Sequence, residues 1–304
     1  MYKRSAIALM ITLFFIMAIS VVLGISLKQL KEATHEVENA NFTLQTSVIL
    51  DDVLTILKNS ADLNAIYKDG SKETLYIFLS EASLIPFEID GIKVLIELKS
   101  ARTNLNINSL VDSNGTANIK RVKALEEYLF NYNVNSEYVS MLVDSMSKVK
   151  DDMSYNSAIF NENTHLFRDY IASKEHLEEV NGFFTKSFND NALDEIAFEK
   201  LFYYSKERDS KVDLNYVNAE LWRLLIACDE LRAEELSLGG GSYEKLEDLN
   251  LNEEEKMALE VFSVSFYEPF LDISVEINEG ASAAKIRFEY DMKSKKGSNF
   301  VYDI

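Results

Sequence analysis

The stretch Ala6–Leu27, AIALMITLFFIMAISVVLGISL, contains no charged side chain. As a helix rising about 1.5 Å per residue, it would extend about 33 Å, enough to cross a hydrocarbon core of about 30 Å. The preceding residues, Met1–Ser5, include Lys3 and Arg4, and the positive-inside rule places such a basic end in the cytoplasm. We therefore predict a transmembrane helix over 6–27, with the bulk of the chain across the membrane. A cleaved secretory signal is the alternative.

The apolar pattern continues beyond this stretch with a helical spacing. No proline or glycine interrupts the chain between Lys28 and Asp69, so the pattern favours one long helix continuing over residues 28–60. A short juxtamembrane helix followed by a separate amphipathic helix is the alternative. The apolar residues that recur at three- and four-residue steps are Leu27, Leu30, Ala33, Val37, Ala40, Leu44 and Val48.

Strand patterns follow this helix. Leu75, Ile77 and Leu79 alternate with other side chains, which predicts a strand, and Ile92–Leu98 predicts a second strand after a turn at Asp90-Gly91. Residues 61–110 are therefore predicted to form the first part of a β domain.

The middle of the chain, residues 111–260, has helical periodicity and contains the run Gly239–Gly241, which we interpret as a flexible connector. Alternation returns in residues 261–304, where 271–277 and 286–290 predict a hairpin with a longer loop over Asn278–Ser282. The predicted fold class is therefore α+β: a long N-terminal transmembrane helix, an antiparallel sheet, and a large all-helical insertion within that sheet.

The composition argues against several functions. The net charge of −19, from 31 basic and 50 acidic side chains, repels phosphate backbones and so disfavours nucleic-acid binding. The single cysteine, Cys228, lies in an apolar run and suits a buried position. Catalytic and dinucleotide-binding motifs are absent from the sequence. We therefore predict no enzymatic activity and no organic cofactor, and a membrane-anchored hydrolase that uses a pair of carboxylates is an alternative.

Two acidic segments are weak candidates for a structural calcium site, because calcium prefers several carboxylate and carbonyl oxygens. The first combines Asp190 with Asp194 and Glu195, and the second combines Asp248 with Glu253. Neither has the spacing of a twelve-residue calcium loop. The alternative is that these side chains cap helices and keep loops soluble.

Two further segments carry a resemblance to a known family. One is Ile96–Leu110, IELKSARTNLNINSL, with Arg102, Asn104 and Asn106; the other is Val212–Ala219, VDLNYVNA, with Asn215 and Asn218. Together with the basic leader and the apolar helix, they resemble type IV pilin-like proteins, and more specifically the K-type minor pseudopilins of type II secretion systems. The second motif has one extra residue between its two asparagines.

This resemblance implies a structural role in protein export. A prepilin peptidase would cleave between Ser5 and Ala6, where the family prefers glycine before the cut, and the new N-terminus would be methylated. Met10 would then stand at the fifth mature position, where most pilins have glutamate and K-type members do not. The implied protein is anchored in the inner membrane with a pilin-like periplasmic domain that binds calcium. Its partners would be other minor pseudopilins and the inner-membrane secretion platform, at the tip of a short filament.

A second function stays open at this point. The chain could be a single-pass inner-membrane sensor or accessory protein whose periplasmic helical domain binds a ligand. The five residues on the cytoplasmic side leave nothing there to signal with, so a sensor of this kind would need a membrane partner.

Overall fold

The computed structural model describes residues 40–70, 72–81, 83–89, 91–150, 154–280 and 282–303. The predicted leader, the cleavage position at Ser5 and Ala6, the transmembrane helix over 6–27 and the first part of its continuation lie outside these residues. Among the residues that are described, no helix is both long and apolar enough to cross a membrane.

The described chain begins with a helix over residues 40–59. Its other α-helices are α2 (Ala61–Asp69), α3 (Lys72–Glu81), α4 (Ile119–Phe130), α5 (Glu137–Ser145), α6 (Ile159–Glu162), α7 (Lys174–Phe188), α8 (Phe198–Leu201), α9 (Ala219–Ile226), α10 (Glu230–Leu238) and α11 (Glu253–Leu259). The strands are β1 (Leu84–Ile89), β2 (Ile92–Ser100), β3 (Leu105–Asn106), β4 (Phe202–Tyr203), β5 (Val212–Asp213), β6 (Val264–Ser265), β7 (Phe270–Glu279), β8 (Ser282–Asp291) and β9 (Lys296–Asp303).

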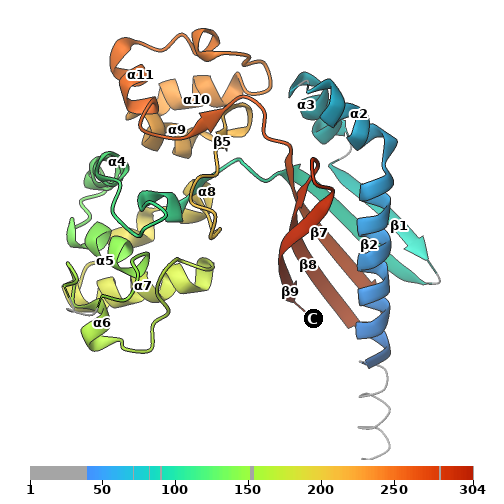
Figure 1. Ribbon diagram of the computed structural model, residues 1–304, viewed down its shortest axis with the longest axis horizontal. Helices are drawn as coiled ribbons and strands as arrows, with labels where there is room; N and C mark the ends of the chain where they lie inside the picture. The colour runs from blue at the N-terminus through green and yellow to red at the C-terminus, as the bar shows by residue number, and fades with distance from the viewer. Residues whose placement is uncertain are drawn as a thin grey trace, which may run out of the picture.

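Five of the strands form one antiparallel sheet in the order β1-β2-β7-β8-β9. The helix over residues 40–59 lies across this sheet (Figure 1). Alternate residues of β2 are buried, as expected for a strand with one covered face. We call the helix, α2, α3 and the five strands the sheet lobe; it has its own hydrophobic core.

The residues between β2 and β7 form a second, mostly helical body, the helical lobe, beside the sheet lobe (Figure 1). It too has its own core, built around Trp222, Tyr138 and Phe184. The insertion was predicted to be all-helical, and this detail is wrong. Two parallel two-residue ladders, β3 with β4 and β5 with β6, fasten loops of the lobe together.

The predicted strand at Leu75–Leu79 is also wrong, because these residues lie in α3. Leu75 and Leu79 are buried while Ile77 is 53% exposed, so the buried residues are spaced by one helical turn. The strand that pairs with β2 is instead β1. It contains Pro86, which an edge strand tolerates because one side of its backbone needs no ladder partner.

The predicted strands at Ile92–Leu98, 271–277 and 286–290 are confirmed as parts of β2, β7 and β8, the inner strands of the sheet. The longer hairpin loop is wrong, because pairing continues to Glu279 and Ser282. Gly280, at φ +59°, supplies the left-handed backbone that so tight a turn requires. The edge strand β9 had no clear alternating pattern in the sequence.

The helix over residues 40–59 has two different faces. Phe42, Val53 and Leu57 are among the residues that join the core of the sheet lobe. Leu44, Val48 and Ile56 are between 61% and 66% exposed. The apolar face predicted at Leu44 and Val48 is thus the face turned away from the sheet core.

Candidate functional site

The region that sets the relative position of the two lobes is where the chain leaves the sheet after β2 and re-enters it at β7. Three segments meet there, residues 100–108, 212–218 and 263–270, and we call them the lobe junction. Ala101 donates its backbone N–H to the carbonyl of Phe270 at 2.9 Å, and Asp213 donates to the carbonyl of Arg102 at 2.8 Å.

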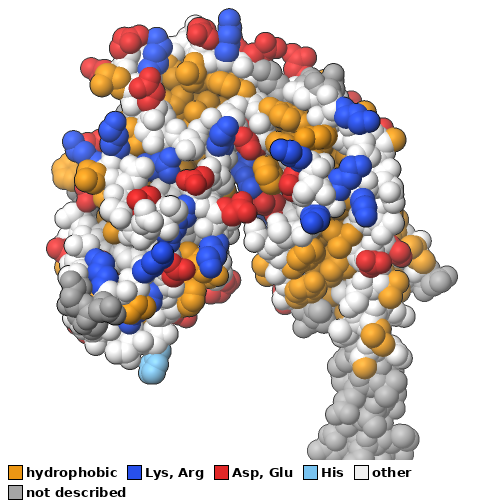
Figure 2. Space-filling model, in the orientation of Figure 1, with side chains coloured by type: hydrophobic (Ala, Val, Ile, Leu, Met, Phe, Trp, Pro, Cys, Tyr) orange, Lys and Arg blue, Asp and Glu red, His pale blue; other side chains and the backbone are white. Residues whose placement is uncertain are grey.

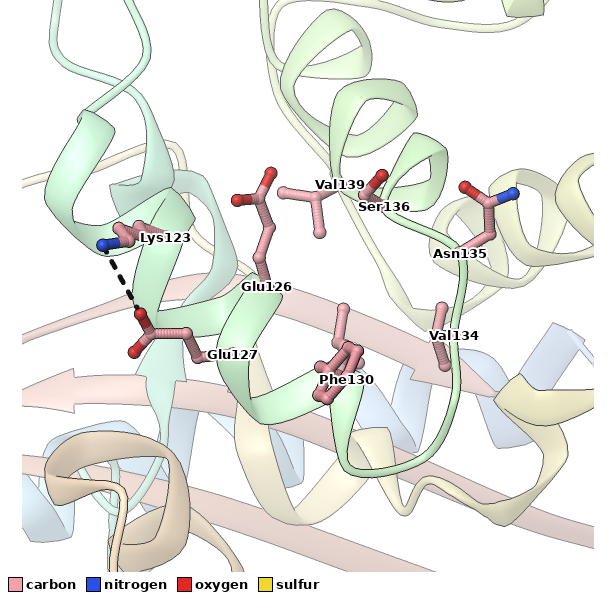
Figure 3. A pocket seen from close by; sticks show the side chains of 9 residues that line it. Lys123, Glu126, Glu127, Phe130, Val134, Asn135, Ser136 and Val139 are labelled. Atoms are coloured by element: carbon pink, nitrogen blue, oxygen red, sulfur yellow. Dashed lines mark ion pairs between the residues drawn. The ribbon is translucent and has the colours of Figure 1, made fainter.

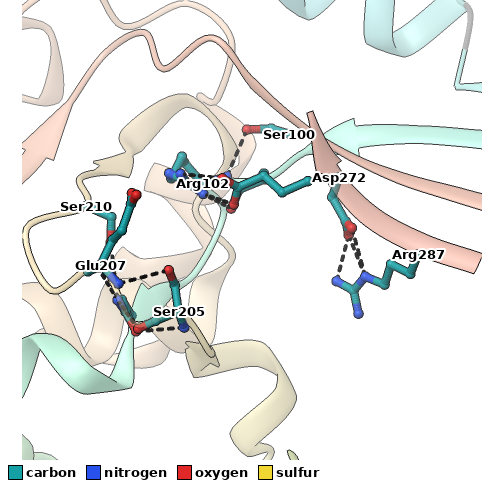
Figure 4. Close-up of polar contacts among 10 residues, drawn as sticks. Ser100, Arg102, Ser205, Glu207, Ser210, Asp272 and Arg287 are labelled. Atoms are coloured by element: carbon teal, nitrogen blue, oxygen red, sulfur yellow. Dashed lines mark hydrogen bonds and ion pairs between the residues drawn. The ribbon is translucent and has the colours of Figure 1, made fainter. Parts of the chain in front are cut away.

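Arg102 is the central charged residue of the lobe junction and is only 3% exposed. Its guanidinium donates to both carboxylate oxygens of Glu289 on β8, at 2.5 and 2.9 Å, and lies 4.1 Å from the ring centre of Phe270. Figure 4 shows Arg102 and its polar contacts beside the sheet. Burial lowers the pKa of Arg102, but the bond to Glu289 and the surrounding charges outweigh it and the pKa is raised. This bidentate pair ties the exit of β2 to β8, which is separated from β2 by β7 in the sheet.

The asparagines after Arg102 hold loops of the helical lobe. The Asn106 amide nitrogen donates to the carbonyls of Ser205 and Glu207 at 3.0 and 2.6 Å. Asn108, fully buried, both donates to the carbonyl of Ile171 and accepts its N–H, at 2.9 and 2.7 Å. Each amide thus takes the place of a backbone partner that irregular loops lack.

The asparagines of the second motif also bond to backbone groups, on the other side of the lobe junction. Asn215 donates to the carbonyls of Tyr243 and Phe266 at 3.0 and 2.9 Å and accepts the N–H of Tyr243 at 3.0 Å. Asn218 caps α9 through the N–H of Leu221 at 3.0 Å, as expected for an asparagine at this position.

Two of the predicted motif residues have additional partners near the lobe junction. Asn104 donates to the carbonyl of Glu199 at 2.8 Å, and Asn218 donates to the carbonyl of Lys200 at 2.7 Å. Both therefore fasten the same short segment around α8, which places the two motifs on one polar network.

The glycine run lies between the lobes rather than acting only as a flexible connector. A Cβ on Gly240 would lie 2.6 Å from the carbonyl oxygen of Asn215, and one on Gly241 would lie 2.7 Å from the ring of Tyr76 on α3. Gly241 also has φ +84°, which favours glycine. The ring of Tyr76 is 5.8 Å from that of Tyr216, so α3 contacts the helical lobe here.

The structure therefore brings together Arg102, Asn104, Asn106, Asn215 and Asn218 as a scaffold that holds loops and lobes in place. The motifs did not identify Asn108, Asp213 or Glu289. The repeat of asparagine at every second position in 104–108 is the signal that could have included Asn108. Asp213, buried, accepts the N–H groups of Asn215 and Glu268 at 3.1 and 3.0 Å.

The candidate calcium ligands occupy capping positions. Asp190 accepts the N–H of Ala192 at 2.9 Å. Asp248 accepts the N–H groups of Glu244 and Lys245 at 2.7 and 3.0 Å.

The remaining candidates add no ligand cluster to these caps. Glu253 pairs with Lys256 at 2.7 Å, while Asp194 and Glu195 lie in the short 3-10 turn Ala192–Glu195. Within the described residues, no three or more histidine, cysteine or acidic side chains gather as a metal site. The two segments do not fit a calcium site in this arrangement, and structural calcium stays a prediction.

Comparison with known proteins gives a structural likeness only. No known family profile matches the chain, and no curated protein sequence matches it. A similar solved structure is a chain of the GspK-GspI-GspJ complex from the enterotoxigenic Escherichia coli type 2 secretion system, with a TM-score of 0.52 and 11% identity. The likeness covers 88% of this chain and 99% of that one. The chain therefore has a pseudopilin-like fold.

Proposed function

We propose that this protein is a minor pseudopilin that helps initiate or cap the periplasmic filament of a type II secretion system. It acts by protein–protein contacts and catalyses no reaction. In this proposal, residues 6–27 anchor it in the inner membrane, the prepilin peptidase removes residues 1–5, and the K-type role at the filament tip applies.

The observation that carries the proposal is the helical lobe inserted between β2 and β7 of a pilin-like sheet (Figure 1). The similar chain was solved in a complex of three secretion components and is covered over 99% of its length. A body of this size beside the sheet would obstruct a subunit stacked above it, which supports a position at the end of a filament. The partners proposed are other minor pseudopilins and the secretion platform.

The exposed side of the helix over residues 40–59 supports lateral packing. Leu44, Val48 and Ile56 present apolar side chains to solvent on the helix that would continue into the anchor. Exposed apolar groups on one helix are favoured contacts for a second helix. We propose that neighbouring pseudopilin helices cover this face.

Disulfide crosslinking in cells tests the partners. Val48→Cys, in a chain where Cys228→Ser removes the native thiol, is expected to crosslink to proteins that themselves carry a basic leader and an N-terminal apolar helix. The matched control is Leu231→Cys, which is 79% exposed on α10 and lies away from the helix over residues 40–59 (Figure 1). A transducing membrane protein crosslinked at position 48 would support the sensor alternative and contradict a pseudopilin role.

The mass of the mature chain tests the processing step separately. Cells with the cognate peptidase are expected to contain a chain beginning at Ala6, methylated at its new N-terminus. A chain that retains Met1–Ser5 in those cells would contradict peptidase processing.

A further inference from the structure

A hollow of about 520 Å³ lies between α4 and α5 on the helical lobe, and nothing in the proposed filament role uses it. Its floor is formed by Leu129, Val134 and Val139, all buried. Phe130 stands at its edge and is 76% exposed. Figure 3 shows Phe130 at the end of α4 and Val134 on the loop that leads to α5. We call this hollow the α4–α5 groove.

The exposure of Phe130 follows from the geometry of α4. Leu125, Tyr128 and Leu129 face the lobe core, and Phe130 lies about 100° further round the helix axis than Leu129, outside that face. A large aromatic side chain beside an apolar hollow is the usual anchor of a binding site, because covering it removes apolar surface from water.

The charge at the α4–α5 groove is acidic and only partly compensated. Glu127 pairs with Lys123 at 3.7 Å, with both side chains well exposed, and such a pair is weak. Glu126 points into the space between α4 and α5 (Figure 3), and no ion pair of Glu126 is recorded among the described residues. The net charge of −19 adds a field that attracts cations.

We propose that the α4–α5 groove binds a segment of a partner protein that presents a large apolar side chain next to a lysine or arginine. The apolar side chain would cover the floor beside Phe130, and the cation would pair with Glu126. A hollow of this volume is within the usual range of about 300–1,000 Å³ for binding pockets. α4 and α5 lie on the far side of the helical lobe from the helix over residues 40–59 (Figure 1), so this binding surface is separate from the filament contacts.

Fluorescence polarisation with three synthetic amphipathic helical peptides tests this inference on the purified full chain in detergent. The first peptide carries leucine, phenylalanine and lysine; the second replaces lysine with glutamate; the third replaces the apolar residues with serine. We expect binding of the first peptide alone. Phe130→Ser and Glu126→Lys should each weaken it about tenfold, the loss of one anchor contact.

The matched control is Leu231→Ser, which removes an equally exposed apolar side chain outside the groove and should leave binding unchanged. Because Phe130 and Leu231 are both exposed, neither change removes core packing. The inference is overturned if no peptide binds at millimolar concentration, if the third peptide binds as well as the first, or if all variants bind equally. Light scattering that shows a dimer abolished by Phe130→Ser would instead assign the groove to a second copy of the chain and overturn the proposed partner. None of these outcomes depends on the proposed filament role.

Discussion

The two lobes differ in how their polar side chains contribute to the interior. In the sheet lobe, ion pairs lie on the solvent-facing side of the sheet, such as Arg287 with Asp272 at 2.6 Å and Lys285 with Glu276 at 2.5 Å. The helical lobe also has exposed charged side chains (Figure 2), such as Lys123 and Glu127. In addition, this lobe and the lobe junction contain buried amide side chains that bond to backbone groups, as Asn108 and Asn215 do.

The difference follows from the backbone. Paired strands satisfy their own N–H and C=O groups, so the side chains between them are free to be apolar inside and charged outside. Irregular loops that are buried have unpaired backbone groups, and amide side chains satisfy them because one amide both donates and accepts. A polar side chain in the lobe junction should therefore matter more to stability than one on the sheet surface.

The largest expected effect is at Arg102. Arg102→Met leaves the Glu289 carboxylate, 14% exposed, without its cation, and breaking a buried pair typically lowers the free energy of unfolding by about 3–5 kcal/mol. Urea denaturation of the full chain, followed by circular dichroism, measures the loss. The matched control is Arg287→Met, whose side chain is 64% exposed. Equal losses in the two variants would remove the distinction between the lobe junction and the sheet surface.

A smaller loss is expected at Asn215. Asn215→Ala leaves the N–H of Tyr243 and the carbonyls of Tyr243 and Phe266 without this partner, and the expected loss is about 2–3 kcal/mol. Hydrogen exchange at the Tyr243 amide should accelerate more than exchange in β2 or β8. Asn104→Ala, which removes an exposed bond to Glu199 and a long bond to Phe202, is the comparison variant and should cost less than Asn215→Ala. If hydrogen exchange accelerated equally throughout the chain, Asn215 would stabilise the whole fold rather than the lobe junction alone.

The helix cap at Asn252 provides an exposed polar contact within the helical lobe to compare with the buried one at Asn215. Its side chain accepts the N–H of Glu255 at 2.9 Å, and Glu255 accepts the N–H of Asn252 at 2.9 Å. Asn252→Ala should lower the free energy of unfolding by about 1 kcal/mol, because this cap is exposed. Asn252→Ser should recover most of the loss; no recovery would show that capping is not the reason.

The smallest effect is expected on the outer face of the sheet. Arg287→Gln removes the pair with Asp272, and exposed pairs contribute about 0–1 kcal/mol. The loss should shrink further in high salt, since salt screens such pairs. Urea denaturation at low and high salt measures it. A loss as large as that of Arg102→Met would show that the exposed pair on the sheet stabilises the fold as much as the buried pair at the lobe junction.

Much of the sheet could be predicted, because alternation is a local property of a strand. Ile92–Leu98 and the two strands around Asn278–Ser282 were identified in this way. Leu75–Leu79 was misread because a short run that alternates by chance also fits a helix with Leu75 and Leu79 one turn apart. Only burial separates the two cases.

The polar network was only partly predictable. The motifs around Arg102 and Asn215 marked the right segments, but not what the side chains bond. Glu289 is 187 positions from Arg102 along the chain, and no spacing rule connects residues so far apart. Structural calcium stays a prediction; in the described residues, Asp190 and Asp248 accept hydrogen bonds from separate backbone groups.

The sequence by itself determined the inner strands β2, β7 and β8 of the central sheet and the helical character of the insertion, because periodicities of two and 3.6 residues are properties of contiguous segments. It also predicts the membrane anchor over 6–27, which lies outside the described residues. Only the tertiary structure decided that α3 is a helix, that Gly241 packs on Tyr76, and that Arg102 meets Glu289. Each of these outcomes depends on contacts between segments that are far apart in the sequence, and such contacts form only when the cores of the two lobes are packed.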